Sequence, residues 1–244
     1  MYQSITCPLV ASDWERFDFY VKRIKCLSTS HHFPGLALDP SAFCIIKLSH
    51  CLLPLLPNLQ YLDTFTSADH PLWNMSPLLG HKLKHFSLDL FCSKKSLLLN
   101  TSILTLLLVH TPFLEYLQVS NLNSIQQLSS FLSGTICSLK HLCVLQLGYT
   151  SLTSECINHL STLSNLVDLE IMITWDTNMQ VASATICAIS FPALRVLIIW
   201  MELWVIVDAF IETYLQLLSL EMVTFWVDEA LMNGHFHWLF TTMC

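Results

Sequence analysis

Residues 142–147 read LCVLQL, and this stretch decides the fold because its spacing recurs along the chain. Apolar side chains stand at its first, fourth and sixth positions, Leu142, Leu145 and Leu147. The spacing occurs seven times, and the other sets are Leu59, Leu62 and Thr64; Leu83, Phe86 and Leu88; Leu114, Leu117 and Val119; Leu166, Leu169 and Ile171; Leu194, Leu197 and Ile199; Leu215, Leu218 and Leu220. Successive sets start 24, 31, 28, 24, 28 and 21 residues apart.

A repeat of roughly 20–29 residues with this apolar pattern is typical of leucine-rich repeats. Between the sets, residues 96–109, 124–132 and 153–163 carry apolar residues at helical spacing, and residues 181–189 and 205–215 do so more loosely. Pro57, Pro112 and Pro192 each stand two residues before a set, where proline ends a helix. We therefore predict an α/β leucine-rich-repeat solenoid, or horseshoe, with a curved parallel sheet and convex helices. An ordinary compact α/β domain is the structural alternative.

The repeat also predicts how the chain is divided. Residues 1–40 precede it and are expected to form a linker with a helical lead-in, and residues 41–225 form the leucine-rich-repeat domain. Residues 226–244 break the pattern and are expected to form an atypical C-terminal tail, without the cap that repeat arrays usually carry.

The residues between the apolar positions are candidates for a binding surface. Alternate side chains of a strand point to opposite faces, so these residues are expected to line the concave face. Concave solenoid faces bind partners, and tyrosine and tryptophan are frequent anchors of protein interfaces. The candidate partner-binding residues are Tyr61, Asp63, His85, Asp89, Tyr116, Gln118, Gln146, Asp168, Glu170, Ile198, Trp200 and Glu221.

Composition narrows the class of protein. The chain has 244 residues, of which 53% are hydrophobic and only 12% charged, so it can bury a large core. A net charge of −7 with scattered lysine and arginine argues against nucleic acid as a partner. The most apolar run, residues 194–211, is interrupted by Arg195, Glu202 and Asp208, which argues against a membrane span. The first residues lack a signal peptide, so we expect reduced cysteines and an intracellular location, cytoplasmic or nuclear.

Motifs for catalysis are missing from the sequence. The five glycines are not clustered into a phosphate loop, and there is no G-x-S-x-G elbow or C-x-x-C pair. Cys137, His141 and Cys143 have no fourth metal ligand nearby. Asp168 and Glu170 are spaced as paired carboxylates, but no nucleophile accompanies them. We expect no enzyme activity, cofactor or metal, and a protein of unknown identity as the partner.

One segment resembles a known family. Residues 13–27, DWERFDFYVKRIKCL, resemble the stretch that leads from the F-box into leucine-rich repeats in F-box proteins of basidiomycete fungi. The phrases LPNLQYL at residues 56–62 and HTPFLEYL at residues 110–117 are similar to phrases in those repeats. The resemblance covers roughly residues 8–225, and it implies the substrate-recognition part of an SCF-type ubiquitin ligase, in which an F-box docks the adaptor subunit.

The F-box itself is expected upstream of Trp14, where only thirteen residues remain. The resemblance therefore predicts the ligase adaptor as a partner only if an upstream F-box exists. The alternative is a free-standing leucine-rich-repeat scaffold, or a truncated gene product, with no ligase role.

Overall fold

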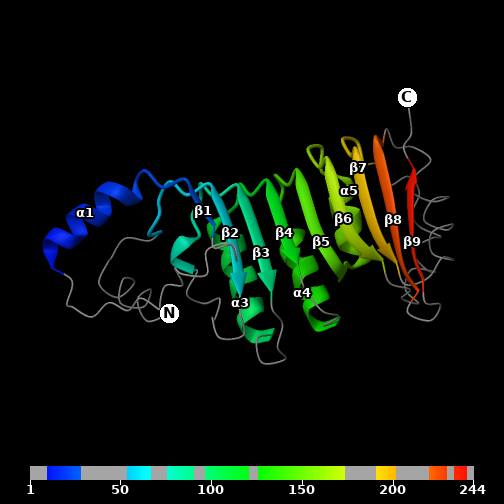
Figure 1. The fold of residues 1–244 in the computed structure, drawn as a ribbon, viewed down its shortest axis with the longest axis horizontal. Helices are drawn as coiled ribbons and strands as arrows, with labels where there is room; N and C mark the ends of the chain where they lie inside the picture. Colours follow the sequence, from blue (N-terminus) through cyan, green and yellow to red (C-terminus); the bar gives the residue numbers. More distant parts are fainter. Residues whose placement is uncertain are drawn as a thin grey trace. The chain divides into compact units, whose positions relative to one another are not determined.

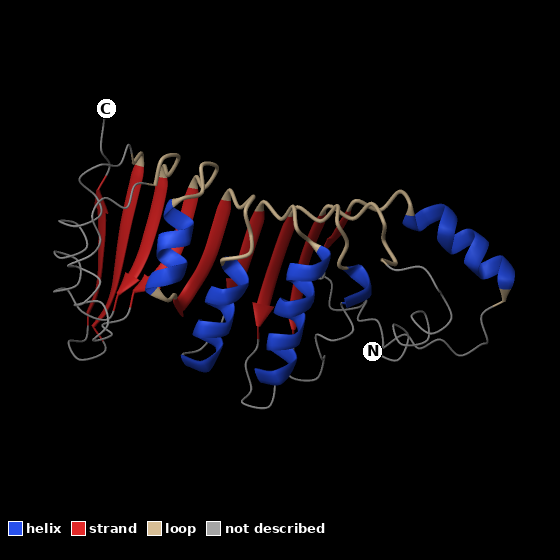
Figure 2. Cartoon of the chain, turned by 180° about the vertical axis from the view of Figure 1, so that it is seen from behind, coloured by secondary structure: helices blue, strands red, loops and turns tan. Residues whose placement is uncertain are grey.

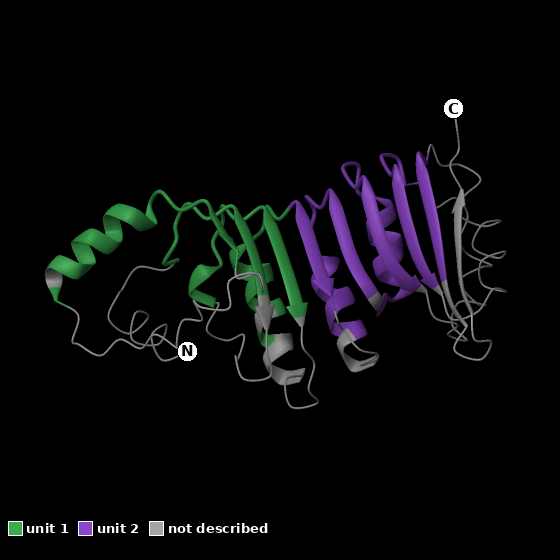
Figure 3. Ribbon diagram, viewed as in Figure 1, with its two compact units in different colours: residues 1–114 green, residues 115–244 purple. Residues whose placement is uncertain are grey.

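The computed structural model describes residues 10–28, 54–66, 76–90, 97–120, 126–173, 191–201, 220–229 and 234–240. The chain divides into two compact units, residues 1–114 and residues 115–244 (Figure 3). Each unit combines strands with helices, so the predicted α/β class is confirmed.

The described part of unit 1 contains three strands and two α-helices. Its elements are α1 (Ala11–Val21), β1 (Cys26–Ser28), β2 (Tyr61–Thr66), β3 (His85–Leu90) and α3 (Leu97–His110). The strands pair in parallel in the order β1-β2-β3. The segment that resembles F-box proteins forms α1 and β1, and α3 confirms the helix expected at residues 96–109.

Unit 2 continues the alternation of strand and helix. Its elements are β4 (Tyr116–Ser120), α4 (Gln126–Ile136), β5 (Val144–Ser151), α5 (Ser154–Ser161), β6 (Asp168–Ile173), β7 (Val196–Met201), β8 (Met222–Glu229) and β9 (Gly234–Phe240). Strands β4 to β8 pair in parallel in chain order, and β9 pairs with β8 in antiparallel fashion. Figure 1 looks onto the strands, and Figure 2, from behind, shows α4 and α5 covering their other face.

A tight turn precedes five of the described strands. In each, the backbone N–H of the first leucine of a set donates to the carbonyl three residues earlier, at 2.9–3.4 Å. These leucines are Leu59, Leu83, Leu114, Leu166 and Leu194. Proline is the second residue of three of these turns, where its fixed φ is favourable. The prolines therefore act through the turns that precede β2, β4 and β7.

The residue just before each of six described strands aligns the next strand along the chain. Its carbonyl accepts two consecutive backbone N–H groups from the following repeat, as when Lys25 accepts from Gln60 and Tyr61 at 2.8 and 3.0 Å. Gln60, Glu115, Cys143, Val167 and Arg195 accept two N–H groups in the same way. This repeated contact fixes the register, and it places equivalent residues of neighbouring strands side by side.

The core is built from the apolar sets. All eighteen side chains of the first six sets are at most 2% exposed, which confirms that they form the core. Burial of one leucine is worth about 1.5–3 kcal/mol, so these sets supply most of the gross stabilisation. Between β5 and β6, helix α5 begins as expected at residues 153–154, because the Thr153 hydroxyl accepts from the backbone N–H of Cys156 at 3.3 Å.

The seventh apolar set was predicted in the wrong register. Strand β8 begins at Met222, and the buried apolar residues here are Leu220, just before the strand, and Val223 and Phe225 within it. The predicted set contains three leucines and ends at Leu220, but this residue is the first of the true set. That set lies 26 residues after Leu194, within the expected range of the repeat. Leu215, Leu218 and the helices expected at residues 181–189 and 205–215 lie outside the described residues.

Two strands were not predicted. Strand β1 has only three residues, and β9 follows the last apolar set. His235 and His237 occupy alternate positions of β9. Strand β8 crosses the predicted boundary between residues 225 and 226. Along the sequence, the boundary between the two compact units falls between residues 114 and 115, inside the predicted repeat domain.

Among the helices that the structure describes, none is both long enough and apolar enough to cross a membrane.

Replacing either of two glycines of unit 2 with alanine is expected to change the stability of the protein, in opposite directions. Gly148 has φ of +52° at an irregularity of β5, whereas Gly134 lies on the exposed surface of α4. At either position, an added Cβ would meet no atom within 4 Å. Gly148→Ala is expected to destabilise the protein by about 1–2 kcal/mol, because alanine is strained at positive φ. Gly134→Ala is expected to stabilise it by about 0.5–1 kcal/mol, because alanine favours the helix.

Urea unfolding of both variants and the wild-type chain measures these changes, and each variant is the control for the other. A Gly148→Ala protein as stable as wild type would contradict the assigned backbone conformation of β5.

Candidate functional site

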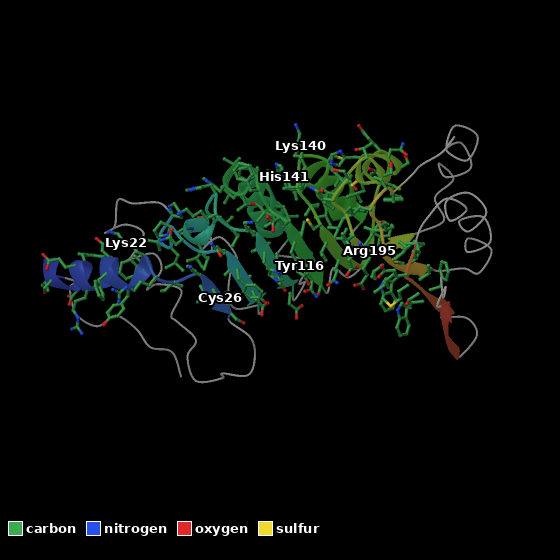
Figure 4. The ribbon with its side chains drawn as sticks, turned by 90° about the horizontal axis from the view of Figure 1, so that it is seen from above. Lys22, Cys26, Tyr116, Lys140, His141 and Arg195 are labelled. Atoms are coloured by element: carbon green, nitrogen blue, oxygen red, sulfur yellow. The ribbon has the colours of Figure 1, made fainter. Side chains whose placement is uncertain are left out.

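Eleven of the twelve predicted binding residues lie on strands. They are half-buried and alternate with the buried leucines, so they point to the sheet face away from the helices. We call this the front face, which Figure 1 views directly. Tyr61, Asp63, His85 and Asp89 lie on the front face of unit 1, and Tyr116, Gln118, Gln146, Asp168, Glu170, Ile198 and Trp200 on that of unit 2. In Figure 4, Tyr116 lies on the opposite side of the unit 2 strands from Lys140 and His141.

In unit 1 the front face holds an aromatic pair beside a carboxylate. The rings of Tyr61 and His85 stack at 4.0 Å between centroids, because the two residues are partners in the register of β2 and β3. Asp63 accepts a hydrogen bond from the Ser28 hydroxyl at 2.9 Å. Burial lowers the pKa of His85 despite the opposing charge of Asp63, which favours a neutral imidazole stacked on the tyrosine.

In unit 2, polar side chains bond to one another from strand to strand. The Tyr116 hydroxyl lies 3.0 Å from Gln118 Oε1 and 2.9 Å from Gln146 Oε1, and with its single proton it donates to one of them at a time. Gln146 Nε2 donates to Asp168 Oδ2 at 3.4 Å. The chain of contacts spans β4, β5 and β6, so these side chains largely satisfy each other.

Asp168 is the electrostatically unfavourable member of this chain. Its Oδ1 is buried and accepts no hydrogen bond from a described residue. Burial raises the pKa of Asp168, the nearby Glu170 adds to the rise, and the hydrogen bond from Gln146 opposes it. The folded protein therefore favours the protonated form of this carboxyl more than the unfolded chain does.

Strands β6, β7 and β8 carry an aromatic pair at the front face. Trp200 Nε1 donates to Glu170 Oε1 at 2.8 Å, and the indole stacks on that of Trp226 with centroids 5.0 Å apart and planes 10° apart. Trp226 was not among the predicted site residues, because the seventh set was misplaced. The spacing of Leu220, Val223 and Phe225 would have revealed it.

Glu221 does not belong to the front face. It precedes β8, is exposed, and pairs with Arg195 at 3.2 Å, where both side chains are more than 60% exposed. The predicted alternation after Leu220 placed it on a strand that begins one residue later. Met172, Val196, Met222 and Thr224 are further residues that the register places beside the predicted ones.

The four described cysteines are free thiols, Cys26, Cys137, Cys143 and Cys156. Cys156 is buried and contacts Cys137 by a side-chain hydrogen bond, and burial strongly raises the pKa of its thiol. Such a thiol stays protonated and packs as a small apolar group. Within the described ranges, no three His, Cys, Asp or Glu side chains gather as metal ligands would.

The sequence matches no protein-family model and no curated protein.

The raised pKa of Asp168 makes stability depend on pH. Its folded-state pKa lies above the ordinary value of 3.8, so its favourable contribution is present below that value and is lost as the pH rises through the folded-state pKa. Asp168→Asn removes the ionisation, and we expect this variant to melt at a higher temperature than wild type at about pH 7, with the difference shrinking towards about pH 4.

Thermal melts of the two proteins across this range test the expectation. A difference in melting temperature that is independent of pH would assign the effect of Asp168→Asn to packing rather than to ionisation.

Proposed function

We propose that this protein is a leucine-rich-repeat module that binds another protein through the front face of its sheet, and that it catalyses no reaction. In this proposal the sheet is curved, and the front face is its concave side. The repeat spacing, the parallel strands and the helices on one face support the solenoid architecture.

The observation that carries the binding proposal is the front face at β7 and β8. Val196, Ile198, Trp200, Met222 and Trp226 are half-buried there, although they are large apolar or aromatic residues. Such side chains gain free energy when a partner covers them, and tryptophan is enriched among the residues that dominate binding energy. A partially exposed patch bordered by polar groups is the usual anatomy of a protein interface.

Following the resemblance to fungal F-box proteins, we further propose that the bound partner is a target for ubiquitin ligation. In this scheme the repeats hold the target, and an upstream F-box docks the adaptor of an SCF-type ligase. This part of the proposal depends on residues 13–27 and on the two repeat phrases alone. The module without a ligase role, acting as a free-standing scaffold, is the alternative.

The binding proposal predicts the effect of changing two front-face residues. Tyr116→Ala combined with Trp200→Ala removes a hydroxyl and an indole from the face while leaving the buried sets intact. We expect the double variant to lose at least about 90% of the partner captured from the native organism's extract, since loss of such anchors typically costs about 2 kcal/mol or more. Affinity capture followed by quantitative mass spectrometry measures this loss.

Lys140→Ala combined with His141→Ala is the matched control, because both residues are exposed on the other side of the unit 2 strands. Circular dichroism melts of both double variants show whether they remain folded. Equal capture by the folded Tyr116/Trp200 variant and by wild type places the binding surface elsewhere.

The ligase proposal has a separate test in the 5′ end of the native transcript. We expect an in-frame F-box upstream of the codon for Met1. A stop codon immediately upstream in that frame rules out docking to a ligase by this route and favours the scaffold.

A further inference from the structure

Three neighbouring strands of unit 2 bring apolar side chains together on the front face. Met172, Trp200 and Trp226 are partners in the register of β6, β7 and β8, and Val196 lies beside Met222 in the same strands. We call these residues, together with Ile198, the tryptophan patch. All are half-buried, so the patch offers apolar surface that a partner can cover.

Carboxylates border the patch, and the positive charges of the described part of unit 2 lie elsewhere. Asp168 and Glu170 occupy front-face positions of β6, directly beside Val196 and Ile198. The described lysine and arginine of this unit are Lys140, which precedes β5, and Arg195, which precedes β7 and pairs with Glu221. Across the front-face positions of β4 to β8 that the structure describes, the formal charge is therefore negative.

The contact between Trp200 and Glu170 joins the aromatic and acidic parts. The 2.8 Å hydrogen bond from the indole N–H holds the Glu170 carboxylate at the edge of the Trp200 ring, and the nearly parallel Trp226 ring stacks on one face of that indole. Indole faces attract cations, and a carboxylate next to them adds an acceptor for the same cation. A planar guanidinium fits this combination better than an ammonium, because it stacks on rings and donates several hydrogen bonds in one plane.

We propose that the tryptophan patch binds a protein segment in which an arginine lies beside apolar residues. The guanidinium stacks on the face of Trp200 that Trp226 does not cover and approaches Glu170, and the apolar side chains cover Val196, Ile198 and Met222. A phosphate-bearing partner is disfavoured, because the carboxylates repel it. This inference rests on the proposed binding function and adds the chemistry of the partner.

Two blocked synthetic peptides test the proposal on the full chain. The first alternates leucine with arginine, and the second carries citrulline, which is uncharged and nearly isosteric, in place of arginine. We expect the arginine peptide to bind at least about tenfold more tightly in calorimetric titrations, because only the guanidinium cation gains the charge and ring interactions. The preference is expected to fall as salt is added.

Variants locate the contact. Glu170→Gln and Trp226→Ala are each expected to weaken binding of the arginine peptide about five- to tenfold while affecting the citrulline peptide less. Glu155→Gln is the matched control, because it also removes one carboxylate but lies exposed on α5, away from the front face. Trp226→Phe keeps an aromatic ring and is expected to retain part of the preference, which guards against a Trp226→Ala variant that fails to fold.

Equal binding of the two peptides, binding of neither, or an equal loss with Glu155→Gln and Glu170→Gln overturns the proposal of an arginine site. None of these results changes the capture experiment with the Tyr116/Trp200 variant, which tests the front face without assuming the chemistry of the partner. Failure of the arginine site and failure of the binding function are therefore distinguishable.

Discussion

Burial of every second side chain of the strands is the constraint on which the rest of the structure depends. A strand of one repeat is too short to enclose a core, so its leucines are covered only by neighbouring strands and by helices on one side. The carbonyl before each strand then accepts two N–H groups of the next repeat, as Cys143 does from Val167 and Asp168 at 2.8 and 3.2 Å. Because this register is repeated, the side chains between the leucines form rows across the strands.

Those rows give the front face its chemistry. In unit 1, the row through Tyr61 and His85 produces a stacked aromatic pair. In unit 2, neighbouring positions produce the hydrogen bonds from Tyr116 to Gln146 and from Gln146 to Asp168. A substitution in the buried sets would shift the strands and disturb these contacts indirectly, whereas a substitution on the front face changes the chemistry while leaving the core in place.

Much of the fold followed from the sequence, because apolar spacing reports burial directly. Six sets and three helices were placed near their observed positions, and Thr153 was recognised at a helix start. The seventh set was misplaced because leucines were given more weight than other apolar residues. Val223 and Phe225 are buried in the core just as the leucines of the other sets are. Strand β1 is too short to show a period, and β9 pairs with β8 outside the repeat.

The candidate site was predictable only in part. Alternation indicated which residues share a face, and eleven of the twelve lie on the front face. It could not tell which side chains touch, because the bond from Trp200 to Glu170 and the stacking on Trp226 depend on rotamers as well as register. The raised pKa of Asp168 likewise depends on burial by neighbours from other strands.

Polar and apolar side chains are distributed unevenly over the front face of unit 2, and this distribution determines where covering the face would be most favourable. From β4 to β6, Tyr116, Gln146 and Asp168 bond to one another, so a partner must break existing hydrogen bonds to form new ones, and the net gain is small. At β7 and β8, Ile198 and Met222 are half-buried and have no polar group to satisfy, so covering them costs no hydrogen bond. Under the binding proposal, we therefore expect a partner to gain most of its affinity at the tryptophan patch, and the polar rows to act mainly on its orientation.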